Sequence, residues 1–243
     1  MLSEFTREEL AAGLDRVAEE ILQQADVQRP PVDALAIAKR LGIVVAWDDR
    51  QSGRARYVRL NDRWSGGAMP TILLRPEPRF ERRQWAVAHE IGEHTAHRFF
   101  ARWGVDPRET VPNAREQVAN QLAGRLLLPT VWFERDAAEC NWDLLTLKAR
   151  YGTASHELIA RRMLECRLPV VISIFDHARL SFRRGNLPGR VPPPSSVEMA
   201  CWRYAHSRRR THRIRDGAAT IQSWPIHEAG WQREILRTEI EEW

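Results

Sequence analysis

The segment from residue 85 to residue 97 constrains the fold of this chain more than any other. It reads Trp-Ala-Val-Ala-His-Glu-Ile-Gly-Glu-His-Thr-Ala-His, contains no proline, and spaces its apolar residues as one face of a helix does. A helix turns about 100° per residue, so His89 and Glu93, which are four residues apart, share one face. The segment therefore predicts a helix that buries one side and presents an imidazole beside a carboxylate on another.

The same segment carries the residue types of a metal site. Glu90 directly follows His89, and the order His-Glu-x-x-Glu differs by one residue from His-Glu-x-x-His, in which both histidines bind zinc and the glutamate acts as a base. The second ligand is either Glu93 or the next residue, His94. In a regular helix His94 points about 140° away from His89, so it would need a π-bulge, which Gly92 would make easier. We favour Glu93.

The segment alone establishes neither which metal ion is bound nor whether one is bound at all. Carboxylates are ordinary zinc ligands, although a site with more oxygen also suits manganese or ferrous iron. The alternative is a solvated helix that binds no ion, because histidine and glutamate are common on exposed faces.

Length and composition indicate a globular protein with one hydrophobic core, or with one core and a smaller second one. The chain has 243 residues, of which 43% are hydrophobic and 28% charged. No apolar run reaches the roughly 18 residues of a membrane span, and the acidic N-terminus lacks an apolar signal core, so we expect a cytoplasmic protein. The three cysteines form no Cys-x-x-Cys pair, which argues against a disulfide framework and a thiolate zinc site.

Two features raise the alternative of DNA binding. The net charge is +5, and arginines cluster in residues 208–215, which we interpret as a solvated loop rather than a nucleic-acid contact. Residues 142–164 have the order helix, turn, helix, and the second helix would present Arg161 and Arg162 to DNA. Any helical hairpin gives this pattern, so DNA contact is the weaker interpretation.

The remaining pattern predicts an α+β fold. Helices and short strands are expected first, over residues 5–25, 33–41, 43–47, 56–60, 71–74 and 114–128. After residue 169 the pattern predicts a hairpin, a helix, a strand and a final amphipathic helix, over residues 170–183, 197–209, 217–224 and 231–243. In this last part His227 stands beside Glu228, and we interpret them as a surface pair rather than a second polar site.

Three segments carry a resemblance to a known family. They are Pro30-Pro-Val-Asp with the predicted helix up to Gly42, the Trp-Ala-Val-Ala-His-Glu-Ile-Gly segment, and Glu-Gln-Val-Ala-Asn-Gln-Leu-Ala-Gly-Arg-Leu-Leu-Leu-Pro at residues 116–129. In this order they resemble the ImmA/IrrE family of metallopeptidases, over roughly residues 15–165. That family supplies a metal-binding glutamate from a Glu-x-x-Ala-Asn helix, so the resemblance implies that Glu116 is the third ligand.

The resemblance implies a zincin-like fold, in which a small sheet packs with the metal-binding helix, and a metal-dependent endopeptidase in residues 1–165. Its ligands would be His89, Glu93 and Glu116. Zinc would be the ion, with manganese or iron as alternatives, and Glu90 would activate a metal-bound water. The family usually carries a second histidine where this chain has glutamate, and two carboxylates make the ion a poorer Lewis acid.

Further implications concern the substrate and the rest of the chain. His94 or His97 would serve as an oxyanion donor, although we interpret both first as structural residues. Family substrates are proteins, often helix-turn-helix transcription repressors whose cleavage releases a stress response. Residues 166–243 would form a small regulatory or docking domain. The alternative to an endopeptidase is a catalytically silent protein that binds a partner or DNA through the same fold.

Overall fold

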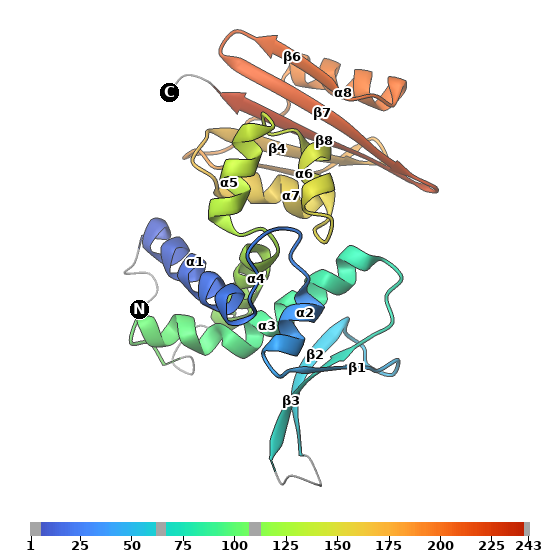
Figure 1. Cartoon of the computed structure of the whole chain (residues 1–243). Helices are drawn as coiled ribbons and strands as arrows, with labels where there is room; N and C mark the ends of the chain where they lie inside the picture. Colours follow the sequence, from blue (N-terminus) through green and yellow to red (C-terminus); the bar gives the residue numbers. More distant parts are fainter. Residues whose placement is uncertain (1–5, 62–66, 107–112, 241–243) are drawn as a thin grey trace. The chain divides into compact units, whose positions relative to one another are not determined.

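The chain folds into two compact units (Figure 1). The computed structural model describes residues 6–61, 67–106 and 113–240, so residue 5 and residues 241–243 of the predicted helices lie outside the described residues. The N-terminal unit consists of residues 1–139 and 149–155, and the C-terminal unit of residues 140–148 and 156–243.

The C-terminal unit takes in residues that lie before the boundary predicted at residue 165. Nε1 of Trp224 donates to Oδ2 of Asp143 at 3.0 Å. Nη1 of Arg233 donates to Oε2 of Glu157 at 2.6 Å. These contacts hold two helical segments on the C-terminal sheet. They join residues far apart in the sequence, which no local pattern reveals.

The first two helices begin at side-chain caps. α1 (Arg7–Gln24) starts with a capping box, in which Thr6 and Glu9 each accept a hydrogen bond from the backbone of the other. α2 (Ala34–Arg40) starts at Asp33, whose carboxylate accepts from backbone N–H groups of the first turn. Such caps satisfy donors that a helix leaves without partners, which is why both starts follow from the sequence.

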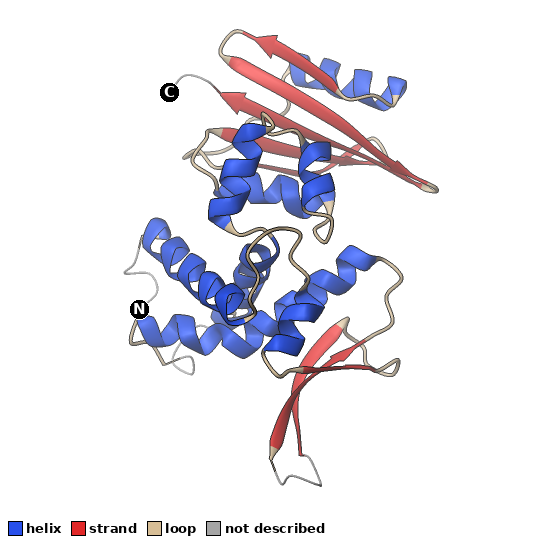
Figure 2. Ribbon diagram, in the orientation of Figure 1, coloured by secondary structure: helices blue, strands red, loops and turns tan. Residues whose placement is uncertain are grey.

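The described residues of the N-terminal unit form one small sheet (Figure 2). It contains β1 (Val44–Trp47), β2 (Ala55–Asn61) and β3 (Ala68–Leu74) in the order β1-β3-β2. β1 is parallel to β3, and β2 is antiparallel to β3. β2 is therefore an edge strand of this sheet, and α3 packs against it.

Two long helices pack closely in this unit. α3 (Phe80–Arg102) is a regular α-helix throughout, and α4 (Ala114–Leu127) lies against it. A Cβ atom added at Gly92 would lie 2.6 Å from the carbonyl oxygen of Ala119. Gly92 therefore permits the close approach of α4. The π-bulge considered for His94 is not formed. After α4 the chain continues into α5 (Thr130–Glu139), a helix that the sequence pattern did not predict.

The C-terminal unit is built on a five-stranded antiparallel sheet in the order β5-β4-β8-β7-β6. The strands are β4 (Val170–Asp176), β5 (Arg179–Gly185), β6 (His212–Asp216), β7 (Ala219–Glu228) and β8 (Trp231–Ile240). The helical elements are α6 (Leu144–Arg150), whose last two residues are counted in the N-terminal unit, α7 (His156–Arg162), the 3-10 helix η3 (Met163–Glu165) and α8 (Ser196–Arg208). The two sheets with their helices confirm the α+β class. Among the described residues, no helix is both long enough and apolar enough to cross a membrane.

The prediction of a final helix over residues 231–243 was wrong, because residues 231–240 form strand β8. Its apolar residues mimic a helical face, but the strand lies between β4 and β7 and is covered on both faces. Charged residues in it are buried as well: Glu234 is 0% exposed and Arg237 1%. Glu234 accepts a hydrogen bond from Trp202, and Nη1 of Arg237 donates to Gln222 and Glu239, so these polar positions do not indicate an exposed helix face.

The arginines considered for DNA contact are held within the C-terminal unit. The side chain of Arg162 is 2% exposed and pairs with Glu165. Arg161 pairs with Glu157 at 2.7 Å and lies over the ring of Phe182. Arg162 is therefore not presented as a recognition helix requires, whereas Arg161 is exposed but held by Glu157 and Phe182.

The second arginine cluster does not form a single loop. Arg209 caps α8 in the left-handed conformation, and Arg213 and Arg215 are exposed on edge strand β6. Charged side chains on an edge strand oppose pairing with other chains.

Candidate metal centre

Two helices bring the three predicted ligands together. α3 supplies His89 and Glu93, and the first turn of α4 supplies Glu116. One ligand atom from each residue lies within 4.8 Å of the other two. The distance from Nε2 of His89 to Oε2 of Glu116 is 3.5 Å. Two ligands of a tetrahedral zinc ion with bonds of about 2.1 Å are separated by about 3.4 Å, so this spacing fits a shared ion.

The three side chains differ in exposure. Those of His89 and Glu93 are 18% and 20% exposed, whereas that of Glu116 is 59% exposed. Nδ1 of His89 is buried and has no hydrogen-bond partner. Nε2, on the other side of the ring, lies beside the carboxylate of Glu116. The donor set of one imidazole and two carboxylates suits zinc, manganese or ferrous iron.

Two neighbours on α4 contact the carboxylates. Nε of Arg115 lies 2.7 Å from Oε2 of Glu93, and its Nη2 donates to the backbone oxygen of Glu93 at 3.2 Å. Nδ2 of Asn120 donates to Oε1 of Glu116 at 3.0 Å. Asn120 thus leaves Oε2 of Glu116 directed at His89, while Arg115 competes with a cation for Glu93. Sequence reasoning did not identify Arg115, although it directly precedes Glu116.

Glu90 points toward the sheet rather than toward α4. Its Oε2 accepts a hydrogen bond from the backbone N–H of Tyr57 on β2 at 2.6 Å. Burial raises the pKa of Glu90. The Tyr57 hydrogen bond and His89 oppose this shift, and the nearby carboxylates Glu93 and Glu116 add to it. No sequence signal marked Tyr57, because its role depends on where β2 passes α3.

His94 and His97 lie outside the ligand cluster. The ring of His94 packs on Tyr57, with centroids 4.9 Å apart, and Nδ1 of His97 lies 2.9 Å from the backbone oxygen of His94. Burial lowers the pKa of His94, and His97 with two arginines lowers it further. Both histidines line a hollow of about 340 Å³ beside Glu93 and Tyr57. The regular helix thus separates Glu93 from His94.

The chain resembles a known family in sequence and a solved structure in fold. The family model described as the IrrE N-terminal-like domain matches residues 38–164. A solved structure titled "Mycobacterium tuberculosis transcriptional regulator" is similar in fold, with a TM-score of 0.64 and 17% identity over 96% of this chain and 80% of that chain. A search of curated proteins found no match. Since the family model covers more than half of the 243 residues and includes every residue of the cluster, this chain belongs to the ImmA/IrrE family.

Proposed function

We propose that this protein is a metal-dependent endopeptidase that cleaves a protein regulator. His89, Glu93 and Glu116 would hold one divalent ion, with zinc as the first choice. The observation that carries the proposal is the convergence of these three donors from two helices, with Glu90 adjacent in sequence to the first of them. Family membership supports peptidase chemistry.

Glu90 would act as the base and then as the acid of the reaction. A bound divalent ion lowers the pKa of a water molecule and polarises the scissile carbonyl. Glu90 would take the proton of the attacking water and pass it to the leaving amine. The N–H of Tyr57 fixes Oε2 of Glu90, so the carboxylate is oriented before substrate binds. His94 and His97, which line the adjacent hollow, remain proposed oxyanion donors.

A peptide substrate is favoured by the edge of the small sheet. Among the described strands β2 lies at an edge of its sheet, and the N–H of Tyr57, which points away from β3, donates to Glu90, so this edge runs beside the cluster. An extended peptide can add to such an edge through backbone hydrogen bonds. Arg59 and Arg115 line the hollow there, so side chains with negative charge would be favoured near the scissile bond. From the family resemblance, we propose a helix-turn-helix repressor as the substrate class.

A second candidate function is a catalytically silent protein that binds the same kind of partner. The ion pair between Arg115 and Glu93 favours it, because a guanidinium 2.7 Å from a ligand oxygen opposes metal binding there. The two functions differ in whether they require the carboxylate of Glu90. An endopeptidase needs Glu90, whereas a binding protein does not.

The test is cleavage of a candidate repressor by the zinc-loaded protein and by its Glu90→Gln variant. Loss of cleavage in Glu90→Gln with retained repressor binding supports the endopeptidase. The matched control is Glu81→Gln, which changes a glutamate in the first turn of the same helix. If the wild type binds the repressor and cleaves nothing, the silent function takes its place.

A further inference from the structure

A second group of histidines and glutamate lies within the C-terminal unit. His206 comes from the last turn of α8, His227 from β7 and Glu234 from β8, and one ligand atom of each lies within 4.8 Å of the others. Nδ1 of His206 lies 2.9 Å from Oε1 of Glu234, and Nε2 of His227 lies 2.5 Å from the same oxygen. Two imidazoles therefore converge on one carboxylate oxygen.

The sheet register explains why two of these residues meet. Pro225 pairs with Glu234 and His227 pairs with Gln232, so His227 and Glu234 are diagonal neighbours on one face of the β7–β8 hairpin. α8 packs against the same two strands and brings His206 to them. The surface pair expected for His227 is therefore not what the fold forms, since its ring faces Glu234.

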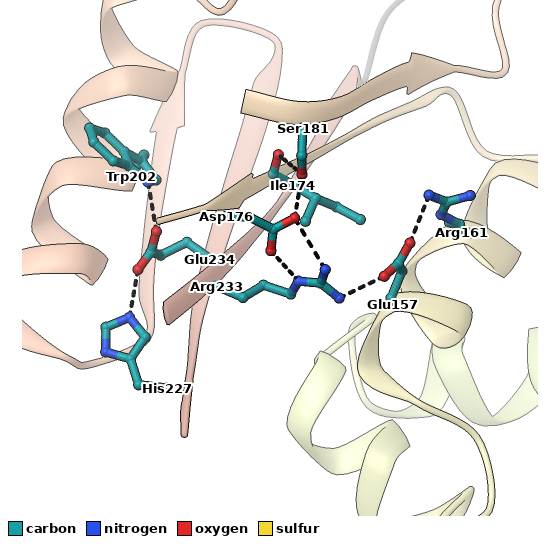
Figure 3. A network of polar contacts seen from close by, with 9 residues as sticks. All are labelled: Glu157, Arg161, Ile174, Asp176, Ser181, Trp202, His227, Arg233 and Glu234. Atoms are coloured by element: carbon teal, nitrogen blue, oxygen red, sulfur yellow. Dashed lines mark hydrogen bonds and ion pairs between the residues drawn. The ribbon is translucent and has the colours of Figure 1, made fainter. Parts of the chain in front are cut away.

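Arg233, which precedes Glu234 on β8, projects to the opposite face of the sheet. Figure 3 shows Arg233 reaching Asp176 and Glu157, while the carboxylate of Glu234 lies between Trp202 and His227. Neighbouring residues of a strand project to opposite faces. The guanidinium of Arg233 is therefore engaged away from Glu234.

Glu234 differs from the buried carboxylates Glu198 and Asp136 in the side chains that contact its carboxylate. Glu198 pairs with Arg183 at 2.9 Å, and the buried Asp136 pairs with Arg150 at 2.8 Å. Glu234 is 0% exposed, and the polar side chains recorded against it in the described part of the chain are two imidazoles and the indole of Trp202. A buried carboxylate needs a positive partner, which imidazoles provide either by protonation or by binding a cation with it.

We propose that His206, His227 and Glu234 bind a divalent transition metal ion, with zinc as the probe of choice. Two imidazoles and one carboxylate form a ligand set that zinc and ferrous iron use. Nε1 of Trp202 holds Oε2 of Glu234 at 3.0 Å, which leaves Oε1 as a single, oriented ligand oxygen. Such an ion would join α8 to the β7–β8 hairpin.

The site is open to an ion from solvent, and one of its imidazole rings is able to turn. The side chain of His206 is 31% exposed, so an ion can arrive from solvent and keep a fourth position for water. Nδ1 of His227 is buried and has no hydrogen-bond partner, so no second bond locks its ring. The ring can therefore turn as the ligand atoms separate to the roughly 3.4 Å that a shared ion sets.

The experiment is a zinc titration of the metal-free full chain against a chromophoric chelator. His89→Ala and Glu116→Gln are introduced first, so that the cluster on α3 and α4 does not contribute. We expect one zinc per chain, and at least tenfold weaker binding when His227→Gln is added. The matched control is His212→Gln, because His212 lies in the same unit, stacks on Tyr204 and is not in the cluster. This control should bind zinc as tightly as its parent.

Three outcomes would overturn the proposal. They are no zinc binding by the parent, binding unchanged by His227→Gln, or equal loss in the His212→Gln control. Circular dichroism checks the fold of each variant, and if His227→Gln unfolds, the half-buried His206→Gln replaces it with the same expected loss. Zinc should also raise the thermal midpoint of the parent and not that of the His206 variant.

Discussion

The two histidine–glutamate clusters use similar side chains in opposite surroundings. The N-terminal cluster lies on two helices, and its Glu116 side chain is 59% exposed. The C-terminal cluster lies between a helix and a sheet, and its Glu234 is fully buried. An exposed ligand such as Glu116 can be lost without loss of the fold, which suits a reaction site. A fully buried ligand such as Glu234 contributes to the fold itself, which suits a structural or regulatory role.

The largest expected effect is that of Glu90→Gln on the cleavage rate, with little effect on stability. Glu90→Gln should lower the rate of repressor cleavage by a factor of about 100 to 10,000, because a general base contributes about that much. Its thermal midpoint should stay close to that of the wild type, since the amide keeps the shape of the carboxylate. Single-turnover cleavage and a thermal melt measure the two quantities. Unchanged cleavage would remove Glu90 from the mechanism.

The next prediction compares the two clusters directly in stability. Glu234→Ala should lower the free energy of unfolding by about 2–4 kcal/mol, because the indole of Trp202 and both imidazoles lose a buried acceptor. Glu116→Ala should change it by less than about 0.5 kcal/mol, because that side chain is largely exposed. Urea unfolding of the metal-free variants measures both. Equal losses would show that burial does not distinguish the clusters.

A third prediction concerns the helix contact behind the N-terminal cluster. Gly92→Ala should destabilise the protein by about 1–3 kcal/mol, because the new Cβ meets the carbonyl oxygen of Ala119 at 2.6 Å. Moving α4 from α3 also moves Glu116 from His89, so zinc affinity at this cluster should fall. Zinc titration of the variant, with the C-terminal cluster silenced by His227→Gln, tests this. Gly124→Ala is the control, since a Cβ there meets nothing within 4 Å.

Acid should reveal how strongly the fold stabilises the charged form of the buried Glu198. Burial raises the pKa of Glu198, but hydrogen bonds from Arg183 and Thr238 outweigh this and hold the pKa below its ordinary value. A lowered pKa in the folded state stabilises the fold above the unfolded-state pKa of about 4.5, and this contribution is lost as the pH falls through the folded-state value. Unfolding free energy should therefore drop below about pH 4.5. Glu198→Gln should show a shallower drop, and an identical slope would contradict this assignment.

The smallest expected effect concerns Arg115, which competes with a metal ion for Glu93 in the N-terminal cluster. Arg115→Gln should leave stability within about 1 kcal/mol, because an exposed ion pair contributes little. It should raise zinc affinity several-fold, since Glu93 no longer shares its carboxylate with a guanidinium. Zinc titration in the His227→Gln background measures the change. Weaker binding in the variant would mean that Arg115 supports the site instead of opposing it.

The first cluster could be predicted because its signals are local. The spacing of His89 and Glu93 follows from helix geometry, and the caps at Thr6 and Asp33 mark helix starts by residue type. The place of Glu116 as third ligand was predicted only from the family resemblance. Residue spacing within one helix does not show which other helix packs on it.

The second cluster could not be predicted from local pattern. His206, His227 and Glu234 lie on three elements, and they meet only when β8 pairs with β7 beneath α8. The sequence instead favoured an amphipathic helix over residues 231–243. Sheet pairing, which buries Glu234 and Arg237, depends on strands distant in the chain.

The most direct test of the central claim is metal content by elemental analysis, in chains that all carry His227→Gln to silence the C-terminal cluster. The reference chain should contain close to one equivalent of zinc. Glu93→Ala should lose it, and His94→Ala should keep it, because the regular helix directs Glu93 to His89 and His94 to Tyr57. Loss in His94→Ala with retention in Glu93→Ala would contradict the proposed ligand set, and a reference chain without metal would contradict the endopeptidase itself.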